Sequence, residues 1–271
     1  MSNIVKKMGA ALEAVRAAVP LVHNITNYVT VNDCANALLA IGGSPIMADD
    51  LGEAADITAI SKALVLNIGT LNARTVEAML ASGRRANELG IPVVLDPVGA
   101  GASALRNETV RRLLREVRFF AVRGNLSELS FLAGLQVHTK GVDVAERDAG
   151  NDAVAVARQV AQDYSCTAAV TGVVDTISDG RRVVRIKNGS MLLGKVTGTG
   201  CMSSAMLGAF AAVEQDGVVA AAAAVLSMAL AGELAEEIAG DVGLGSFHMV
   251  VLDGLSKMSA QMFEERARID E

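Results

Sequence analysis

Short apolar segments alternate with helix-like segments over the first two thirds of the chain, and this alternation constrains the fold more than any other feature. Four apolar runs have about the length of a fully buried strand: residues 63–68, 92–95, 119–122 and 168–171. Between them, residues 72–90 and 151–164 carry apolar side chains at helical spacing. The alternation predicts an α/β fold, in which right-handed βαβ units form a mostly parallel central sheet with helices on both faces.

The last third of the chain has a different pattern. Residues 176–178 and 182–186 predict a β-hairpin, because the Asp179-Gly180 pair between them is a strong two-residue turn signal. After Gly200 we expect helices only, over residues 201–213, 218–238 and 246–268. No internal repeat or linker of biased composition divides the sequence, so we expect a single domain over residues 1–271.

Hydrophobic residues make up 51% of the chain, which raises the question of membrane insertion. The longest weakly polar stretch, residues 218–232, leads directly into Glu233. It is shorter than the roughly 20 apolar residues that a spanning helix needs. We therefore expect a buried core helix and no membrane partner.

Charge and cysteine content exclude other classes of function. The formal net charge is −6, aromatic residues make up 3%, and the basic residues are scattered, so nucleic acid is not expected as a partner. The three cysteines, Cys34, Cys166 and Cys201, are odd in number and widely spaced, which favours neither a disulfide framework nor a cysteine metal site. A reducing cytoplasm suits such a chain best.

A glycine-rich segment around Gly198, Thr199 and Gly200 leads into a predicted helix. Such a turn leaves backbone N–H groups aimed at one point, where the helix dipole favours an anion. A Walker loop is excluded, because the nearby Gly-Lys pair is followed by Val196 rather than by Ser or Thr. A Rossmann fingerprint is also excluded, because helices follow rather than a strand. An anion hole for a transferring phosphoryl group remains, beside the alternative of a glycine helix cap that binds nothing.

Charged residues follow two neighbouring predicted strands. Asp96 ends one strand before a glycine-containing turn, Arg123 ends the next, and Glu128 enters the helix that follows. Ligands bind beyond the strand ends of open α/β sheets. Two carboxylates there predict a Mg²⁺ site beside a polyphosphate. Alternatively, Asp96 forms a turn and Glu128 stabilises a helix dipole.

Five motifs together resemble the hydroxyethylthiazole kinase family of the ribokinase-like superfamily, over about residues 10–265. The motifs are residues 23–30 (HNITNYVT), 43–47 (GSPIM), 96–101 (DPVGAG), 123–125 (RGN) and 198–201 (GTGC). The resemblance implies ATP-dependent phosphorylation of the hydroxyl of 4-methyl-5-(2-hydroxyethyl)thiazole, in thiamine biosynthesis or salvage. It also implies a homotrimer whose thiazole pockets lie between neighbouring subunits.

The resemblance also implies roles for individual residues. Met47 and Gly198, with Asn27, would contact the thiazole, although turn formation explains Asn27 equally well. Arg123, Thr171 and Asn125 would bind ATP, and Asp96 and Glu128 would hold Mg²⁺. These assignments are expectations that the structure can be compared with.

We expect the alcohol to attack the γ-phosphorus in line while the amides of residues 198–201 receive the developing negative charge. Cys201 is the nearest candidate for the general base, at a position where ribokinase-like enzymes more generally carry Asp. We expect the helix N-terminus to lower the pKa of its thiol, and anionic phosphate bound at the same site to raise it again. The alternative is that Cys201 only fills space.

Three other functions stay open at this point. A hydroxymethylpyrimidine kinase would use the same scaffold, although Cys201 and residues 23–30 favour thiazole. A nucleotide-dependent dehydratase of hydrated nicotinamide nucleotides would need a larger pocket. A catalytically silent regulator would bind ATP without forming a phosphorylated product.

Overall fold

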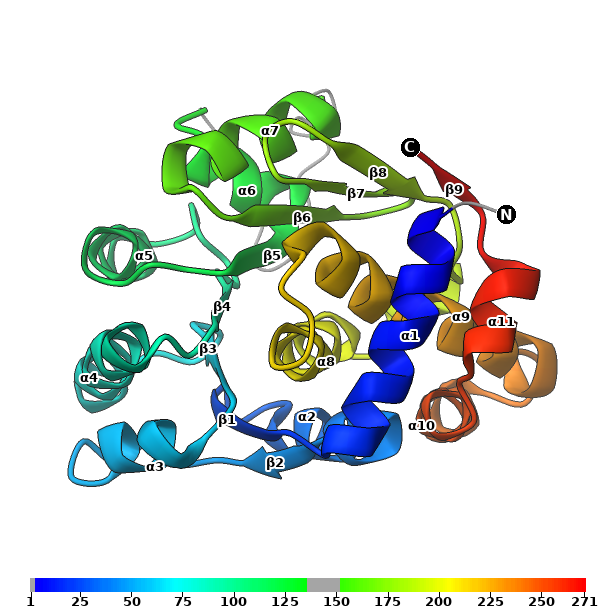
Figure 1. Ribbon diagram of the computed structural model, residues 1–271, viewed down its shortest axis with the longest axis horizontal. Helices are drawn as coiled ribbons and strands as arrows, with labels where there is room; N and C mark the ends of the chain where they lie inside the picture. The colour runs from blue at the N-terminus through cyan, green and yellow to red at the C-terminus, as the bar shows by residue number, and fades with distance from the viewer. Residues whose placement is uncertain (1–2, 136–151) are drawn as a thin grey trace.

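A computed structural model of the chain describes residues 3–135 and 152–271. These residues form one sheet with the strand order β2-β1-β3-β4-β5-β6-β7-β8-β9 (Figure 1). The strands are β1 Leu21–Ile25, β2 Ser44–Ile46, β3 Ala63–Asn67, β4 Val93–Asp96, β5 Ala121–Asn125, β6 Thr167–Thr171, β7 Asp175–Ser178, β8 Val183–Ile186 and β9 Ile269–Asp270. Neighbours from β2 to β6 pair in parallel, and β7 to β9 add on as antiparallel strands. The predicted mostly parallel sheet is confirmed.

Helices cover both faces of the sheet (Figure 1). One face packs against α3 Ala54–Ile60, α4 Ala73–Leu89, α5 Ala104–Glu116, α6 Leu126–Leu132 and α7 Ala153–Tyr164. The other packs against α1 Asn3–Ala18, α2 Val31–Ile41, α8 Thr199–Ala211, α9 Gly217–Ala239, α10 Leu244–Ser256 and α11 Ala260–Arg266. A short 3-10 helix, η2 Met191–Lys195, precedes α8.

Strand β3 shows why the parallel strands read as continuous apolar runs. Ala63 and Val65 belong to the core on the side of α8 and α9, whereas Leu64 and Leu66 belong to the core on the side of α4. All four side chains are buried, because successive residues of a strand point to opposite faces and both faces are covered.

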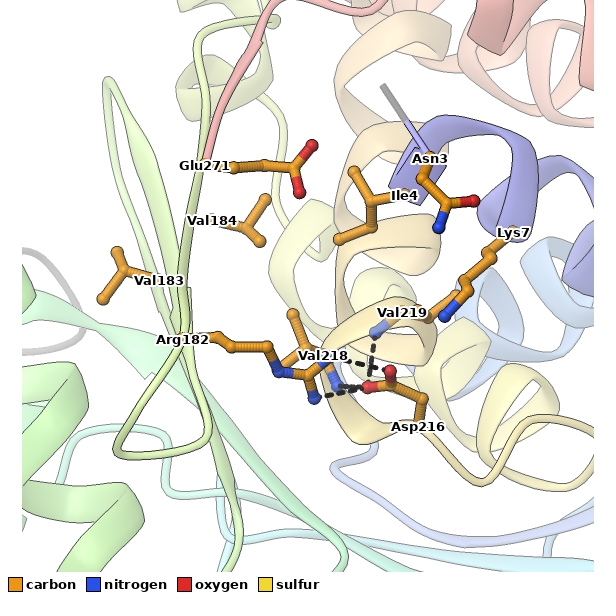
Figure 2. Close-up of a pocket in the computed structure, with 10 residues that line it drawn as sticks. All are labelled: Asn3, Ile4, Lys7, Arg182, Val183, Val184, Asp216, Val218, Val219 and Glu271. Atoms are coloured by element: carbon orange, nitrogen blue, oxygen red, sulfur yellow. Dashed lines mark hydrogen bonds and ion pairs between the residues drawn. The ribbon is translucent and has the colours of Figure 1, made fainter. Parts of the chain in front are cut away.

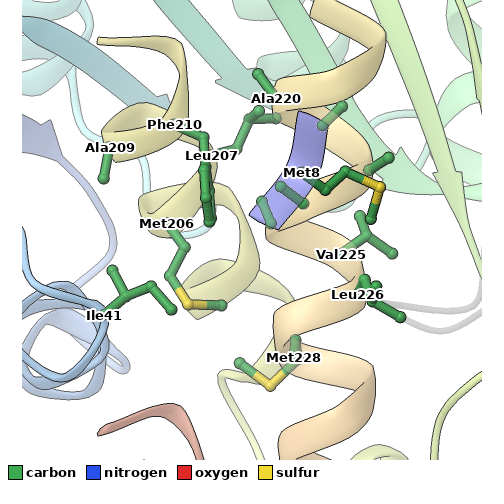
Figure 3. Packing of buried hydrophobic residues seen from close by; sticks show 14 of the residues in the cluster. Met8, Ile41, Met206, Leu207, Ala209, Phe210, Ala220, Val225, Leu226 and Met228 are labelled. Atoms are coloured by element: carbon green, nitrogen blue, oxygen red, sulfur yellow. The ribbon is translucent and has the colours of Figure 1, made fainter. Parts of the chain in front are cut away.

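Among the described residues, α9 is the one helix long and apolar enough to cross a membrane. In the structure it is a core helix, and 89% of its most apolar window is buried. Figure 3 shows Leu207 and Phe210 of α8 and Leu226 of α9 among the packed side chains of this core, with Met8 of α1. The expectation of a buried helix at this position is confirmed.

The C-terminal region differs from the predicted single helix over residues 246–268. That segment contains two helices, α10 and α11, because the chain turns at Met258 and a new N-cap forms at Ser259, whose hydroxyl accepts a hydrogen bond from the amide of Met262 (3.2 Å). Arg16 of α1 donates to the Met258 carbonyl at 2.5 Å and holds the turn. Strand β9 follows, so the expectation that only helices follow Gly200 is wrong.

The predicted hairpin is present as β7 and β8, but its turn is wider than two residues. Ser178 pairs with Val183, so residues 179–182 form the connection. Asp179 accepts hydrogen bonds from the backbone amides of Arg181 (3.0 Å) and Arg182 (2.8 Å), which stabilises this longer loop.

Helix α8 approaches the sheet closely at Gly208, which allows a prediction. A Cβ at this position would lie 2.6 Å from Val65 Cγ2 and 2.8 Å from Val22 Cγ1. We expect Gly208→Ala to lower the unfolding free energy by about 1–3 kcal/mol through overpacking, measured by urea denaturation. Gly245→Ala is the control, because open space surrounds that helical glycine. Because alanine has a higher helix propensity than glycine, we expect Gly245→Ala to raise the unfolding free energy by up to about 1 kcal/mol. Equal effects of the two variants would contradict the packing argument.

Candidate active site

Polar side chains gather where the central parallel strands end. Asn67, the last residue of β3, pairs in register with Asp96, the last residue of β4. Asn125, at the end of β5, pairs in register with Thr171, at the end of β6. Four of these strands therefore present functional groups along one edge of the sheet, the edge at which open α/β folds bind ligands.

The N-terminus of α8 faces the same edge. Its N-cap is Gly198, with φ +92° and no capping side chain. A Cβ at Gly198 would lie 2.9 Å from Thr30 Cγ2, so only glycine fits both the backbone conformation and the space. Thr199 donates from its hydroxyl to the Leu193 carbonyl (3.2 Å), which ties the turn to η2. The first-turn amides thus have no side-chain cap and form a site for an anion.

Arg123 projects from β5 onto this helix terminus. A Cβ at Gly200 would lie 2.5 Å from Arg123 Nη1, so the guanidinium rests directly on the glycine backbone. Its Nη2 donates to Thr171 Oγ1 at 2.7 Å, and its buried Nε has no hydrogen-bond partner among the described residues. The structure therefore brings the predicted anion hole, Arg123 and Thr171 together.

Asp96 is fully buried beneath these groups. Burial raises the pKa of its carboxyl, while the charge of Arg123 and two hydrogen bonds oppose this. Its Oδ2 accepts from Asn67 Nδ2 (2.9 Å) and from Ser204 Oγ (2.8 Å). Its Oδ1 has no partner within the described part of the chain.

Glu128 has a structural role in the first turn of α6, as the alternative to metal binding in the sequence analysis allowed. Its Oε2 accepts from the Asn125 amide and its Oε1 from the Gly99 amide, each at 2.8 Å. Asn125 in turn accepts from the Glu128 amide (2.9 Å), which completes a capping box at the start of α6. Burial, followed by the negative charge of Asp96, raises the pKa of Glu128 to about 7. The predicted ATP ligand Asn125 is thus a helix cap, with its side chain at the edge of the site.

The two carboxylates fit a magnesium site that shares its ligands with phosphate. The buried, unpartnered Oδ1 of Asp96 is an available oxygen ligand, and Glu128 adds a second carboxylate near it. Within the described residues no three His, Cys, Asp or Glu side chains form a metal cluster. A Mg²⁺ ion here would therefore need oxygen atoms from phosphate and water, as Mg²⁺ sites beside polyphosphate usually have.

Cys201 lies in the first turn of α8, half-buried, and its environment contradicts the expected low pKa. Burial raises the pKa of the thiol, and the charge of Asp96 raises it further, more than the hydrogen bonds lower it. Its Sγ receives hydrogen bonds from Asn27 Nδ2 and from Asn67 Nδ2, each at 3.3 Å. The sequence shows the helix N-terminus but not this burial, and burial decides the direction.

Asn27 combines the two roles that the sequence left open. Its Oδ1 accepts from the amide and the hydroxyl of Thr30, each at 3.1 Å, and so it forms the turn before α2. Its Nδ2 reaches Cys201 and Asn67. The residue therefore shapes the turn and also lies in the site.

Met47 follows β2 and lines a cavity of about 170 Å³ that does not include Gly198 or Cys201. Asn24, whose buried Oδ1 lacks a partner in the described chain, lines the same cavity. Val31 is a further lining residue, and the preceding residue, Thr30, lies against Gly198. Met47 and Gly198 thus both lie close to the start of α2, Met47 in the cavity that Val31 lines and Gly198 against Thr30.

A larger cavity of about 330 Å³ lies elsewhere, between α1, the β7–β8 hairpin and the start of α9 (Figure 2). None of the predicted site residues lines it. Arg182 there is already paired with Asp216 through two hydrogen bonds of 2.8 Å. The chemistry predicted from the sequence is therefore not in this cavity.

Sequence reasoning missed three residues of the site: Asn67, Ser204 and Asp175. Asn67 ends an apolar run, as Asp96 does, so the same strand-end argument applies to it. Asp175 begins β7 and accepts from the Gly172 amide (2.9 Å) behind Arg123. Ser204 reaches Asp96 one helical turn after the glycine segment, and only the fold reveals that contact.

Comparison with known proteins identifies the family. The model of the hydroxyethylthiazole kinase family matches residues 12–261. The chain belongs to this family. The hydroxyethylthiazole kinase of Clostridium beijerinckii is 56% identical over 275 residues, with all of both chains covered. The family match favours the predicted thiazole-kinase assignment over a hydroxymethylpyrimidine kinase or a dehydratase.

Solved structures agree with this family assignment. The structure of the hydroxyethylthiazole kinase protein from Pyrococcus horikoshii matches with a TM-score of 0.88 at 40% identity, covering 97% of this chain and 98% of that one. A ribokinase-like superfamily protein from Enterococcus faecalis matches with a TM-score of 0.60 at 10% identity, covering 95% of this chain and 83% of that chain. The latter likeness concerns the fold alone, and it agrees with the predicted ribokinase-like fold.

The buried Asp175 gives a prediction about stability. Burial raises the pKa of its carboxyl to about 7, against the opposing hydrogen bond of Gly172 and the charge of Arg123. In the unfolded chain this group ionises near its ordinary value, so from about pH 4 to 7 the folded state keeps a proton that the unfolded state has lost. The unfolding free energy therefore falls as pH rises through this window.

Asp175→Asn keeps the acceptor for Gly172 and removes the titration. We expect its stability advantage over the wild type to grow by roughly 1–3 kcal/mol between pH 5 and pH 8, measured by urea denaturation. Asp50→Asn is the control, because hydrogen bonds from Gly52 and Arg74 hold the pKa of that exposed carboxyl below its ordinary value. An advantage of Asp175→Asn that does not change with pH would contradict this account.

Proposed function

We propose that this chain transfers the γ-phosphoryl group of ATP to the hydroxyl of 4-methyl-5-(2-hydroxyethyl)thiazole, in thiamine biosynthesis or salvage. The convergence of the uncapped α8 N-terminus, Arg123 and Asp96 at one edge of the sheet carries the proposal, in a chain that belongs to the thiazole kinase family. Phosphoryl transfer needs positioning and charge stabilisation rather than a covalent intermediate, and these groups supply both.

On the ATP side, Arg123 and Thr171 bind the phosphates. The hydrogen bond from Arg123 to Thr171 fixes the guanidinium over Gly200. The Nε of Arg123, which has no partner within the described residues, can donate to a phosphate oxygen. Asn125 contributes by capping α6, which sets the position of Glu128. Asp96 and Glu128 would hold Mg²⁺, which would supply positive charge to neutralise the phosphates.

On the alcohol side, Met47 and Gly198, which both lie close to the start of α2, contact the thiazole. The hydroxyl then lies near the α8 amides, which receive negative charge from the transferring group. Cys201 accepts the proton of the alcohol as a thiolate, after its thiol has lost its own proton to solvent, and the side-chain N–H groups of Asn27 and Asn67 stabilise that thiolate. A competing hydroxymethylpyrimidine kinase predicts ADP release with the pyrimidine alcohol, and a silent regulator predicts no release with either alcohol.

The base role of Cys201 has a direct test. Cys201→Ser keeps the anion hole but removes most of the basicity, so we expect turnover with the thiazole alcohol to fall by roughly 10²–10⁴-fold in a coupled assay for ADP release. Cys166→Ala is the matched control, because that cysteine is buried in the core on the side of α7. Wild-type turnover in Cys201→Ser would refute the base role.

The metal role of Asp96 is tested by its amide. Asp96→Asn lacks the negative charge and places either an N–H or a weaker oxygen ligand at the site, so we expect a higher Mg²⁺ concentration for half-maximal activity. A Mg²⁺ titration of the initial rate measures this, with Asp253→Asn on the exposed side of α10 as the control. An unaltered Mg²⁺ requirement would speak against Asp96 as a ligand.

We further propose that residues 1–271 act as a single domain that assembles into a homotrimer with intersubunit active sites, in the cytoplasm. Tyr28 lines the Met47 cavity and yet is 80% exposed, and its neighbour Val29 is 57% exposed. Large apolar side chains that are exposed beside a ligand cavity favour an interface in which a second copy of the chain covers them. The free cysteines suit a reducing compartment.

The assembly has its own prediction. Light scattering after size exclusion should give three times the chain mass of 28.0 kDa. Tyr28→Glu combined with Val29→Lys should lower both this mass and the turnover, because charges would be buried at the interface. Leu105→Glu, at an exposed apolar residue of α5, should leave the mass unchanged. A wild-type chain that is monomeric and fully active would overturn the proposed assembly.

A further inference from the structure

Asn67 lies at the centre of the site, and every polar atom of its carboxamide has a partner. Its Oδ1 accepts hydrogen bonds from the Gly69 amide (2.9 Å) and from Asn27 Nδ2 (3.1 Å). Its Nδ2 donates to Asp96 Oδ2 (2.9 Å) and to Cys201 Sγ (3.3 Å). The side chain is buried, with 2% of its surface exposed, and it is the shared neighbour of the carboxylate and the thiol.

Backbone amides fix the orientation of both asparagines. The N–H of Gly69 can only donate, so the atom of Asn67 that faces it must be the oxygen, and Nδ2 must face Asp96 and Cys201. The N–H of Thr30 fixes Asn27 in the same way, which turns its Nδ2 toward the sulfur. Two N–H donors therefore point at Sγ from fixed positions, and the sulfur is the acceptor.

The loop after β3 packs against Asn27 and Asn67 and restricts their side-chain positions. A Cβ at Gly69 would lie 2.9 Å from Asn27 Cβ and 2.9 Å from Asn67 Oδ1, so the glycine backbone packs directly on both side chains. Arg106 of α5 holds the loop in turn, because it donates to the carbonyls of Ile68 and Gly69, each at 2.7 Å. Packing and hydrogen bonds with neighbouring protein groups, and not contact with solvent, therefore fix the position of the Asn67 side chain.

We propose that Asn67 is a positioning residue, which holds the Cys201 sulfur and the Asp96 carboxylate in fixed relation for phosphoryl transfer. One amide group spans the two, so a shift of either reacting group would break a hydrogen bond to the same nitrogen. The proposal rests on the proposed function of Cys201 as the base. It adds that Cys201 acts as the base only when Asn67 holds its sulfur in position.

A double-mutant cycle tests whether Asn67 acts through Cys201. We expect Asn67→Ala to lower kcat by roughly 10–10²-fold while the KM for ATP changes less than about 3-fold. In the Cys201→Ser background the same change should lower kcat less than about 3-fold further, because residues that act as a unit are non-additive. Full multiplication of the two effects would overturn the proposal.

Ser204→Ala is the matched control for this cycle. It removes the other donor to Asp96 Oδ2, a hydroxyl that donates to this oxygen rather than to Cys201. Its effect on kcat should therefore multiply with that of Cys201→Ser, and equally strong coupling of Ser204 would show that the coupling is not specific to Asn67. If Asn67→Ala does not fold, Asn67→Thr replaces it in the cycle, since it has about the same volume as Asn, adds no charge beside Asp96 and lacks the Nδ2 donor to Cys201.

A second readout does not depend on activity. In a crystal structure of Asn67→Ala we expect Cys201 Sγ or the Asp96 carboxylate to leave its wild-type position, because their common donor is gone. If Cys201 Sγ and the Asp96 carboxylate both keep their wild-type positions, the positioning role of Asn67 is wrong. If Cys201→Ser keeps wild-type turnover, the base role fails, whereas a displaced Sγ or carboxylate in this structure would still support Asn67 as the residue that positions them.

Discussion

A parallel sheet that is buried on both faces has only its edges available for chemistry, and this constraint shapes the whole molecule. Side chains within β3 point alternately into two apolar cores, so polar groups appear at its last residue, Asn67. The same is true of β4, which ends at Asp96. Because β3 to β6 are parallel, these ends share one edge, and α8 begins there as well.

A site at this edge requires carboxyl groups that are removed from water, which disfavours their charged forms. Asp96, Glu128 and Asp175 are all buried, and burial is the largest influence raising the pKa of each. Arg123 is the cation that offsets all three, and it lies against α8 rather than in a close ion pair with any one of them. The carboxylates closest to the strand ends therefore have capacity for a further positive charge, which suits a divalent cation accompanied by phosphate.

Periodicity could predict the sheet, because a doubly covered strand must be apolar throughout, and residues 63–68 and 92–95 are. It did not predict β1, where His23 and Asn24 are buried. His23 forms hydrogen bonds with Thr58 and with the Ala48 carbonyl, and Asn24 donates to the Val22 carbonyl, while Asn24 Oδ1 has no partner within the described residues. The strand-end argument placed Asp96 correctly at the end of β4, whereas Arg123 lies within β5, which continues to Asn125. Burial of the thiol of Cys201 depends on how α8 packs, and no local pattern contains that information, so the expected direction of its pKa was wrong.

The buried charge at Asp96 also gives a physical reason for a cysteine at position 201. A carboxylate there would add a second negative charge across Asn67 from Asp96, at a place where burial already disfavours charge. A thiol at this position is neutral at rest and carries charge only after it has lost its proton to solvent, as the thiolate that then acts as the base. At that moment the donors from Asn27 and Asn67 already point at the sulfur. The raised pKa therefore does not exclude a base, because it keeps the resting site neutral at the sulfur and makes the thiolate, when formed, a stronger proton acceptor.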